Sequence, residues 1–95
     1  MQGKLKLQEL ESWIAQGEGY HIEFKEVLDK SFSEEVCAFA NGSGGKVLLG
    51  ISDLGKIKGI KTDNVIKSQI QDMVRHIEPP LKIKIEAYQN RKSTK

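Results

Sequence analysis

The chain has 95 residues, of which 38% are hydrophobic and nine are glycine, and its formal net charge is +2. Because domains typically run to roughly 100–150 residues, two domains are excluded, and we expect one domain over residues 1–95. The apolar content is ordinary for a globular protein, which excludes wholesale disorder. A charge of +2 is too small to attract polyanions by itself, so the distribution of charge matters more than its sum.

The sequence shows neither a membrane segment nor a secretion signal. Its longest apolar run, residues 47–51, is far short of the ~18 residues needed to cross a bilayer. The N-terminus alternates charged and apolar residues and lacks the unbroken apolar stretch of a signal peptide. The single cysteine, Cys37, has no partner for a disulfide. We therefore expect a cytoplasmic protein without a membrane partner.

Hydrophobic periodicity predicts the first three elements. The spacing of Leu10, Trp13 and Ile14 predicts a helix over residues 6–16, which Gly17 ends. Apolar residues then alternate with ionisable ones, a pattern that predicts a half-buried strand over residues 20–25. The next apolar stripe predicts a helix over residues 32–41, with Ser31 or Ser33 as its cap.

The second half of the chain predicts a hairpin, a helix and a final strand. The hairpin spans residues 46–51 and 56–60, the helix 63–77 with Thr62 or Asp63 as its cap, and the strand 81–88. The resulting order is α-β-α-β-β-α-β. It predicts the α/β (α+β) class, as a single layered domain with a mixed β-sheet packed by about three helices.

A first candidate site consists of acidic residues near two predicted strands. Glu18, Glu23 and Lys25 lie on or beside the strand at 20–25, and Asp53 follows the strand at 46–51. If these strands are neighbours, three carboxylates and a lysine meet at one end of the sheet. Mg²⁺ and Mn²⁺ prefer such oxygen ligands, which would suit phosphodiester hydrolysis. A solvated charged face and an ordinary turn are the alternative interpretation.

The glycine-rich loop at residues 42–45 is a weaker candidate. Backbone N–H groups of such loops can hold phosphate. However, a Walker A alignment ending at Gly45-Lys46 places Ala40 where glycine is needed and Val47 where serine or threonine is needed. The loop also runs from helix to strand, whereas a Walker loop runs from strand to helix. A helix stop followed by a tight turn is the simpler interpretation.

The lysines form a third candidate site, one that could follow a phosphate backbone. They are placed on the hairpin and on the outward face of the last strand: Lys46, Lys56, Lys58, Lys61, Lys82 and Lys84. The tail at residues 91–95 adds further basic residues. Lysines on strands also protect sheet edges from aggregation, so this pattern alone does not establish binding. Four aromatic residues are expected to pack rather than to stack on bases: Trp13, Tyr20, Phe24 and Tyr88.

Three segments in a fixed order, residues 17–26, 36–53 and 55–60, resemble the Schlafen AlbA-type DNA-binding domain. The resemblance implies a nucleic-acid-binding α/β domain, often the N-terminal module of bacterial transcriptional regulators. Related domains in animal Schlafen proteins are metal-dependent endoribonucleases that use three carboxylates. By motif, Glu18 and Glu23 match two of these carboxylates. Asp53 is the choice for the third, although Ser52 stands where the family often has an additional acid.

The leading hypothesis is a non-catalytic module that binds DNA in preference to RNA and needs no cofactor. Its phosphate contacts are expected from Lys25, Lys46, Lys56, Lys58, Lys82 and Lys84. Because the family domain usually continues with another strand pair, we expect the chain to be a fragment of a longer protein.

Two alternatives remain open. The first is a metal-dependent endoribonuclease, with Glu18, Glu23 and Asp53 as ligands of Mg²⁺ or Mn²⁺ and Lys25 steadying the scissile phosphate. The second is an assembly domain that forms a homodimer through an open sheet edge.

Overall fold

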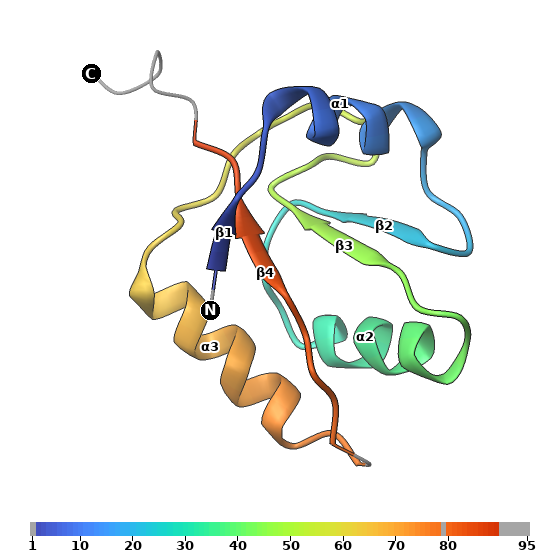
Figure 1. Ribbon diagram of the computed structural model, residues 1–95, viewed down its shortest axis with the longest axis vertical. Coiled ribbons are helices and arrows are strands. Elements are labelled where there is room, and N and C mark those ends of the chain that lie inside the picture. Colours follow the sequence, from blue (N-terminus) through green and yellow to red (C-terminus); the bar gives the residue numbers. More distant parts are fainter. Residues whose placement is uncertain (1, 79, 90–95) are drawn as a thin grey trace.

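The computed structural model describes residues 2–78 and 80–89 (Figure 1). Three helices alternate with four short strands along the chain. In order, they are β1 (Gln2–Lys4), α1 (Leu7–Gln16), β2 (Ile22–Lys25), α2 (Ser31–Asn41), β3 (Lys46–Leu49), α3 (Asn64–Arg75) and β4 (Ile85–Ala87). The predicted α+β class and its three helices are therefore confirmed. Within the described part of the chain, no helix is long and apolar enough to cross a membrane.

The strands form two parallel pairs. β2 pairs with β3, with Ile22 opposite Lys46, and β1 pairs with β4, with Gln2 opposite Ile85. In Figure 1, α1 lies on one side of the β2–β3 pair and α2 on the other, whereas α3 lies beyond β1 and β4. The strands predicted at 20–25 and 46–51 are thus neighbours, which was the condition for the first candidate site.

The two faces of the β2–β3 pair support separate apolar clusters. Ile22 and Phe24 point to the α1 side, where they meet Leu10. Since successive strand residues point to opposite faces, Glu23 and Lys25 point to the α2 side. There, Phe32 of α2 packs with residues of α3 and with Val47 and Leu49 of β3. Both faces of this small sheet are therefore covered by helices.

The outer edge of β2 is closed by its own chain. The His21 and Lys25 carbonyls accept hydrogen bonds from residues at the two ends of β3, so the backbone groups of Ile22 and Phe24 point to the opposite edge. There the Gly19 N–H donates to the Ile22 carbonyl at 2.9 Å, and the Phe24 N–H donates to Glu18 Oε2 at 3.0 Å. These bonds occupy groups that a second chain would need for pairing along β2.

The return strand predicted over residues 56–60 is not formed. A single antiparallel bridge joins Ile51 and Ile57, and the N–H groups of Lys58 and Gly59 both donate to the Gly50 carbonyl. Gly59 has φ +90°, a left-handed conformation that an extended strand does not allow. The prediction of a strand failed because alternation of side chains does not reveal this backbone reversal.

Other predicted boundaries move by smaller amounts. The last strand is restricted to β4, and residues 81–84 belong to no strand. The strand β1 was missed because three residues are too short to show a period. Of the two caps predicted for α3, Thr62 and Asp63, the structure has Asp63, since the Ile66 N–H donates to Asp63 Oδ1 at 3.1 Å. At α2 neither serine is the cap: Lys30 holds that position, and Ser31 is bonded to Asp29.

Candidate functional site

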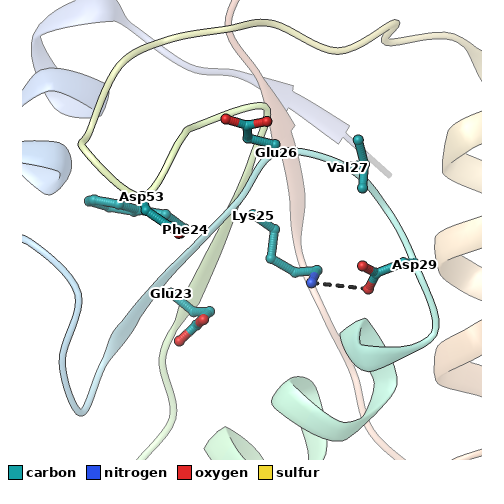
Figure 2. Close-up of a pocket in the computed structure, with 7 residues that line it drawn as sticks. All are labelled: Glu23, Phe24, Lys25, Glu26, Val27, Asp29 and Asp53. Carbon is teal, nitrogen blue, oxygen red and sulfur yellow. Dashed lines mark ion pairs between the residues drawn. The ribbon is translucent and has the colours of Figure 1, made fainter.

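An open pocket of about 390 Å³ brings three of the predicted site residues together. Glu23, Lys25 and Asp53 line it (Figure 2). The other lining residues are Phe24, Glu26, Val27 and Asp29. Four carboxylates and one lysine therefore line the pocket, so it carries a negative charge and repels a bare phosphate.

Lys25 is tied down by neighbouring side chains. Its side chain is only 10% exposed, and its Nζ donates to Ser31 Oγ at 2.7 Å and lies 3.0 Å from Asp29 Oδ1. The hydrogen bond to Asp29 is the main reason that the pKa of Lys25 is raised. The bond donated by Ser31 is the main reason that the pKa of Asp29 is lowered. The ammonium group is thus bonded to Ser31 of α2 and to Asp29 in the loop before it, and it does not point to solvent.

Glu35 is an acidic neighbour that the sequence interpretation missed. Its Oε1 lies 3.7 Å from Lys25 Nζ, which is within ion-pair range but too long for a hydrogen bond. That buried oxygen has no hydrogen-bond partner among the described residues. The only available signal was its place one turn into a helix that begins shortly after β2. That signal does not reveal which face of the helix meets the strand.

Glu23 is surrounded mainly by negative charge. Burial raises the pKa of its carboxyl group, and the nearby carboxylates of Glu18, Glu35 and Asp53 raise it further, against a smaller opposing effect of Lys25. The charged form of Glu23 is therefore disfavoured in the folded protein. This is the electrostatic signature of a carboxylate cluster.

Glu18 has a structural partner of its own. One of its carboxylate oxygens accepts the Phe24 N–H at the outer edge of β2. Glu18 is not among the residues that line the pocket of Glu23 and Asp53. In the described ranges, 2–78 and 80–89, no group of three or more acidic, histidine or cysteine side chains is arranged to hold a metal ion. Glu18 and Asp53 nevertheless both act on the charge of Glu23, so the three-carboxylate metal site stays a prediction.

Ser52, which replaces an acid of the family pattern, organises the turn that carries Asp53. It is buried, and its Oγ accepts the N–H groups of Leu54 at 3.3 Å and Lys56 at 3.1 Å. The Ser52 N–H also donates to the Lys56 carbonyl at 2.9 Å. These bonds leave Asp53 exposed at the tip of the turn.

Three of the predicted lysines lie close to α1. Lys46 Nζ is 5.0 Å from the centroid of the Trp13 ring, a cation–π contact. Lys56 and Lys58 follow Gly55, where an added Cβ would lie 3.2 Å from Ile14 Cγ2. All three lysines are exposed, and none has a carboxylate within ion-pair distance among the described residues. We call Lys46, Lys56 and Lys58 the α1-side lysines.

The remaining predicted lysines lie elsewhere. Lys82 and Lys84 precede β4, and Figure 1 shows this part of the chain at the end of the molecule opposite α1. Both are exposed, and Lys84 Nζ is 3.6 Å from Glu86 Oε2. Lys61 is 3.9 Å from Asp63. The basic tail at residues 91–95 lies outside the described residues. The lysines thus do not form one continuous surface.

The aromatic residues do not all pack as expected. Phe24 is buried, and Trp13 and Tyr88 pack against the same cluster. Tyr20, in contrast, is 94% exposed, so the expectation that it packs is wrong. The physical reason is that β2 begins only at Ile22, so Tyr20 belongs to the preceding turn and not to the apolar face of the strand.

The comparisons with known proteins identify one family. A family model described as Schlafen, AlbA_2 matches residues 18–94. No curated protein and no solved structure matches the chain. The matched range contains both the carboxylate pocket and the α1-side lysines.

Proposed function

The chain belongs to the Schlafen AlbA_2 family, and on that basis we propose that it is a non-catalytic DNA-binding module of a bacterial transcriptional regulator. The observation that carries the proposal is the placement of the α1-side lysines. These three exposed cations have no carboxylate partner among the described residues. Lys46 lies over Trp13 of α1, and Gly55, the residue before Lys56, lies close to Ile14 of α1. Unpaired cations on one side of a domain are suited to phosphate contacts.

The anchoring of Lys56 and Lys58 supports this role. The intervening Ile57 is bridged to Ile51, and the Lys58 N–H donates to the Gly50 carbonyl at 2.8 Å. The two lysines are therefore held by the end of β3, so little backbone order has to be gained on binding. Lys25 is left out of the proposed surface because its ammonium group is bonded to Ser31 and Asp29.

The test is a salt series with duplex DNA. Each phosphate contact contributes about 0.9 to the slope of log affinity against log salt, so Lys56→Ala/Lys58→Ala should reduce the slope by about two. The matched control is Lys30→Ala/Arg75→Ala, which removes the same charge at two exposed positions, the N-cap of α2 and the last residue of α3. Equal slopes for the two double variants would contradict the proposed surface.

Phosphodiester cleavage is the second candidate function, and the observation that favours it is the shared pocket of Glu23 and Asp53. Labelled tRNA and duplex DNA should be incubated with the chain in Mn²⁺ or in EDTA. Under the binding proposal, neither substrate is cleaved, and Glu23→Gln binds as well as or slightly better than the parent because a negative charge is lost. Manganese-dependent cleavage that Glu23→Gln removes would make the protein a nuclease.

An assembly domain is the third candidate. Variants of Lys56 and Lys58 distinguish it from a DNA-binding module. DNA retention that is unchanged when Lys56 and Lys58 are reversed to glutamate would exclude the α1-side lysines as the binding surface. The closed outer edge of β2 limits sheet pairing there, so a homodimer would have to use another edge.

A further inference from the structure

The turn between α1 and β2 presents an aromatic ring to solvent. Tyr20 is 94% exposed, the highest value among the large hydrophobic side chains of the described residues. The backbone around it is fixed: the Gly17 N–H donates to the Ile14 carbonyl, and the Gly19 N–H donates to the Ile22 carbonyl. An exposed ring on an anchored turn is available for stacking and loses little backbone freedom when a ligand binds.

The residue that follows Tyr20 is bonded to the strand that carries Lys46. The carbonyl of His21, the next residue, accepts the Lys46 N–H at 2.7 Å. The His21 Nδ1 lies 3.1 Å from the Gly44 carbonyl oxygen, which only accepts, so Nδ1–H is the donor. Lys46 Nζ is placed over the Trp13 ring. The turn, the glycine-rich loop and the start of β3 therefore meet at one end of the sheet.

We infer that Tyr20, His21 and Lys46 form a binding site for single-stranded nucleic acid, with Tyr20 stacking on a base and Lys46 contacting a phosphate. The inference deepens the proposed DNA-binding function and rests on it. Sequence-tolerant single-strand sites combine these two parts, an aromatic platform and a cation that follows the backbone. A duplex cannot use the platform because its bases are already stacked and paired.

The free charge of Lys46 favours an anionic ligand over a neutral one, and the exposed ring of Tyr20 adds a surface on which a base can stack. Lys46 has no carboxylate partner in the described part of the chain. Of the two nearest acids along the sequence, Glu18 uses one of its oxygens to accept the Phe24 N–H, and Glu23 points to the α2 side of the sheet. The other highly exposed apolar residue, Leu54 at 87%, has no π face on which a base could stack.

The test uses a fluorescein-labelled oligothymidylate of about 12 nucleotides, within the site sizes typical of such modules, and a duplex of the same length. Anisotropy titrations are made with the parent chain, Tyr20→Ala, Tyr20→Phe and the control Val65→Ala, which truncates a 63% exposed side chain on α3. Tyr20→Ala should weaken single-strand binding roughly 5- to 150-fold and leave duplex binding unchanged. Tyr20→Phe, which keeps the ring, should restore binding, and Val65→Ala should have no effect.

Trp13 gives a second readout because it is the only tryptophan. Oligothymidylate that draws Lys46 away from the Trp13 ring should change the intrinsic fluorescence of the parent chain, and Tyr20→Ala should abolish the change at the same oligonucleotide concentration. If Tyr20→Ala binds oligothymidylate as tightly as the parent, the inference is wrong, whereas lysine-dependent duplex binding would leave the proposed function standing.

Three other results would also overturn the inference. Equal weakening of single-strand and duplex binding by Tyr20→Ala would exclude a single-strand platform. Dimerisation that Tyr20→Ala abolishes, without an effect on oligothymidylate binding, would identify the ring as a protein contact. Absence of binding to both nucleic acids would remove the inference and the proposed function together.

Discussion

The two faces of β2 are both covered by helices, but different interactions hold the helix on each face. On the α1 side, Ile22 and Phe24 are 4% and 5% exposed and pack in an apolar cluster with Leu10. On the α2 side, Glu23 and Lys25 meet Ser31, Asp29 and Glu35 through charge and hydrogen bonds. The comparison shows that a polar face of a strand need not face solvent, because a helix can cover it with polar partners.

The comparison also separates DNA binding from phosphodiester cleavage. On the α2 side, the acidic residues lie near Lys25, which is already bonded to Ser31 and Asp29. The α1-side lysines, in contrast, are exposed and have no carboxylate partner within the described ranges. Because polyanions are attracted to unpaired cations and repelled by carboxylates, DNA is expected on the side of α1 and away from the pocket of Glu23.

The apolar face of β2 should give the largest effect on stability. Phe24→Ala should lower the free energy of unfolding by about 3–5 kcal/mol, because it removes a buried ring and leaves a cavity. The measurement is urea unfolding followed by circular dichroism. Leu54→Ala, which truncates an 87% exposed side chain, is the control and should change stability by less than about 0.5 kcal/mol. Similar losses for the two variants would contradict the assigned core.

The α2 side should give an intermediate effect. Lys25→Met should lower the free energy of unfolding by about 1–3 kcal/mol, because Ser31 and the buried oxygen of Glu35 lose the ammonium group. Lys30→Met, at an exposed neighbouring position, is the control and should cost less than about 0.5 kcal/mol.

A second variant sharpens this result. Adding Glu35→Gln to Lys25→Met should recover part of the stability, since it replaces the charge left without its ion pair. If Lys25→Met is as mild as Lys30→Met in the same urea titrations, the bonds of Lys25 do not stabilise the fold.

The smallest effect is expected at Glu23 and depends on pH. Because the folded state raises the pKa of Glu23 above 4.5, its ionisation destabilises the fold, and stability falls as pH rises through that raised pKa. Glu23→Gln should therefore raise the melting temperature at pH 7, by less than the ~4 °C that 1 kcal/mol would give a domain of this size. The difference should disappear below the unfolded pKa of 4.5.

Asp29→Asn is the matched control of opposite sign. The folded state lowers the pKa of Asp29 below 3.8, so its stabilisation is present above that value and is lost as pH falls through the lowered pKa. The variant should melt at a lower temperature than the parent at pH 7. Melting temperatures that move in the same direction for both variants at pH 7 would contradict the assigned electrostatics.

Local patterns in the sequence were sufficient for the class and the three helices, whereas the pairing of β2 with β3 was only a condition of the first candidate site. The period of two in β2 correctly separates Phe24 from Lys25, and Asp63, one of the two caps predicted for α3, is its cap. The motif order also predicted the family that the family model matches. These features depend on neighbouring residues, whose periodicity and capping chemistry can be read directly.

Only the tertiary structure decided which charged residues are available to a ligand. Lys25 and Lys46 look alike in the sequence, yet the first is bonded to Ser31 and Asp29 and the second is exposed over Trp13. Glu18 closes a strand edge, and Tyr20 leaves the apolar face because β2 begins two residues later. The physical reason is that partners such as Glu35 and Trp13 come from other elements, and no local pattern specifies which faces those elements bring together.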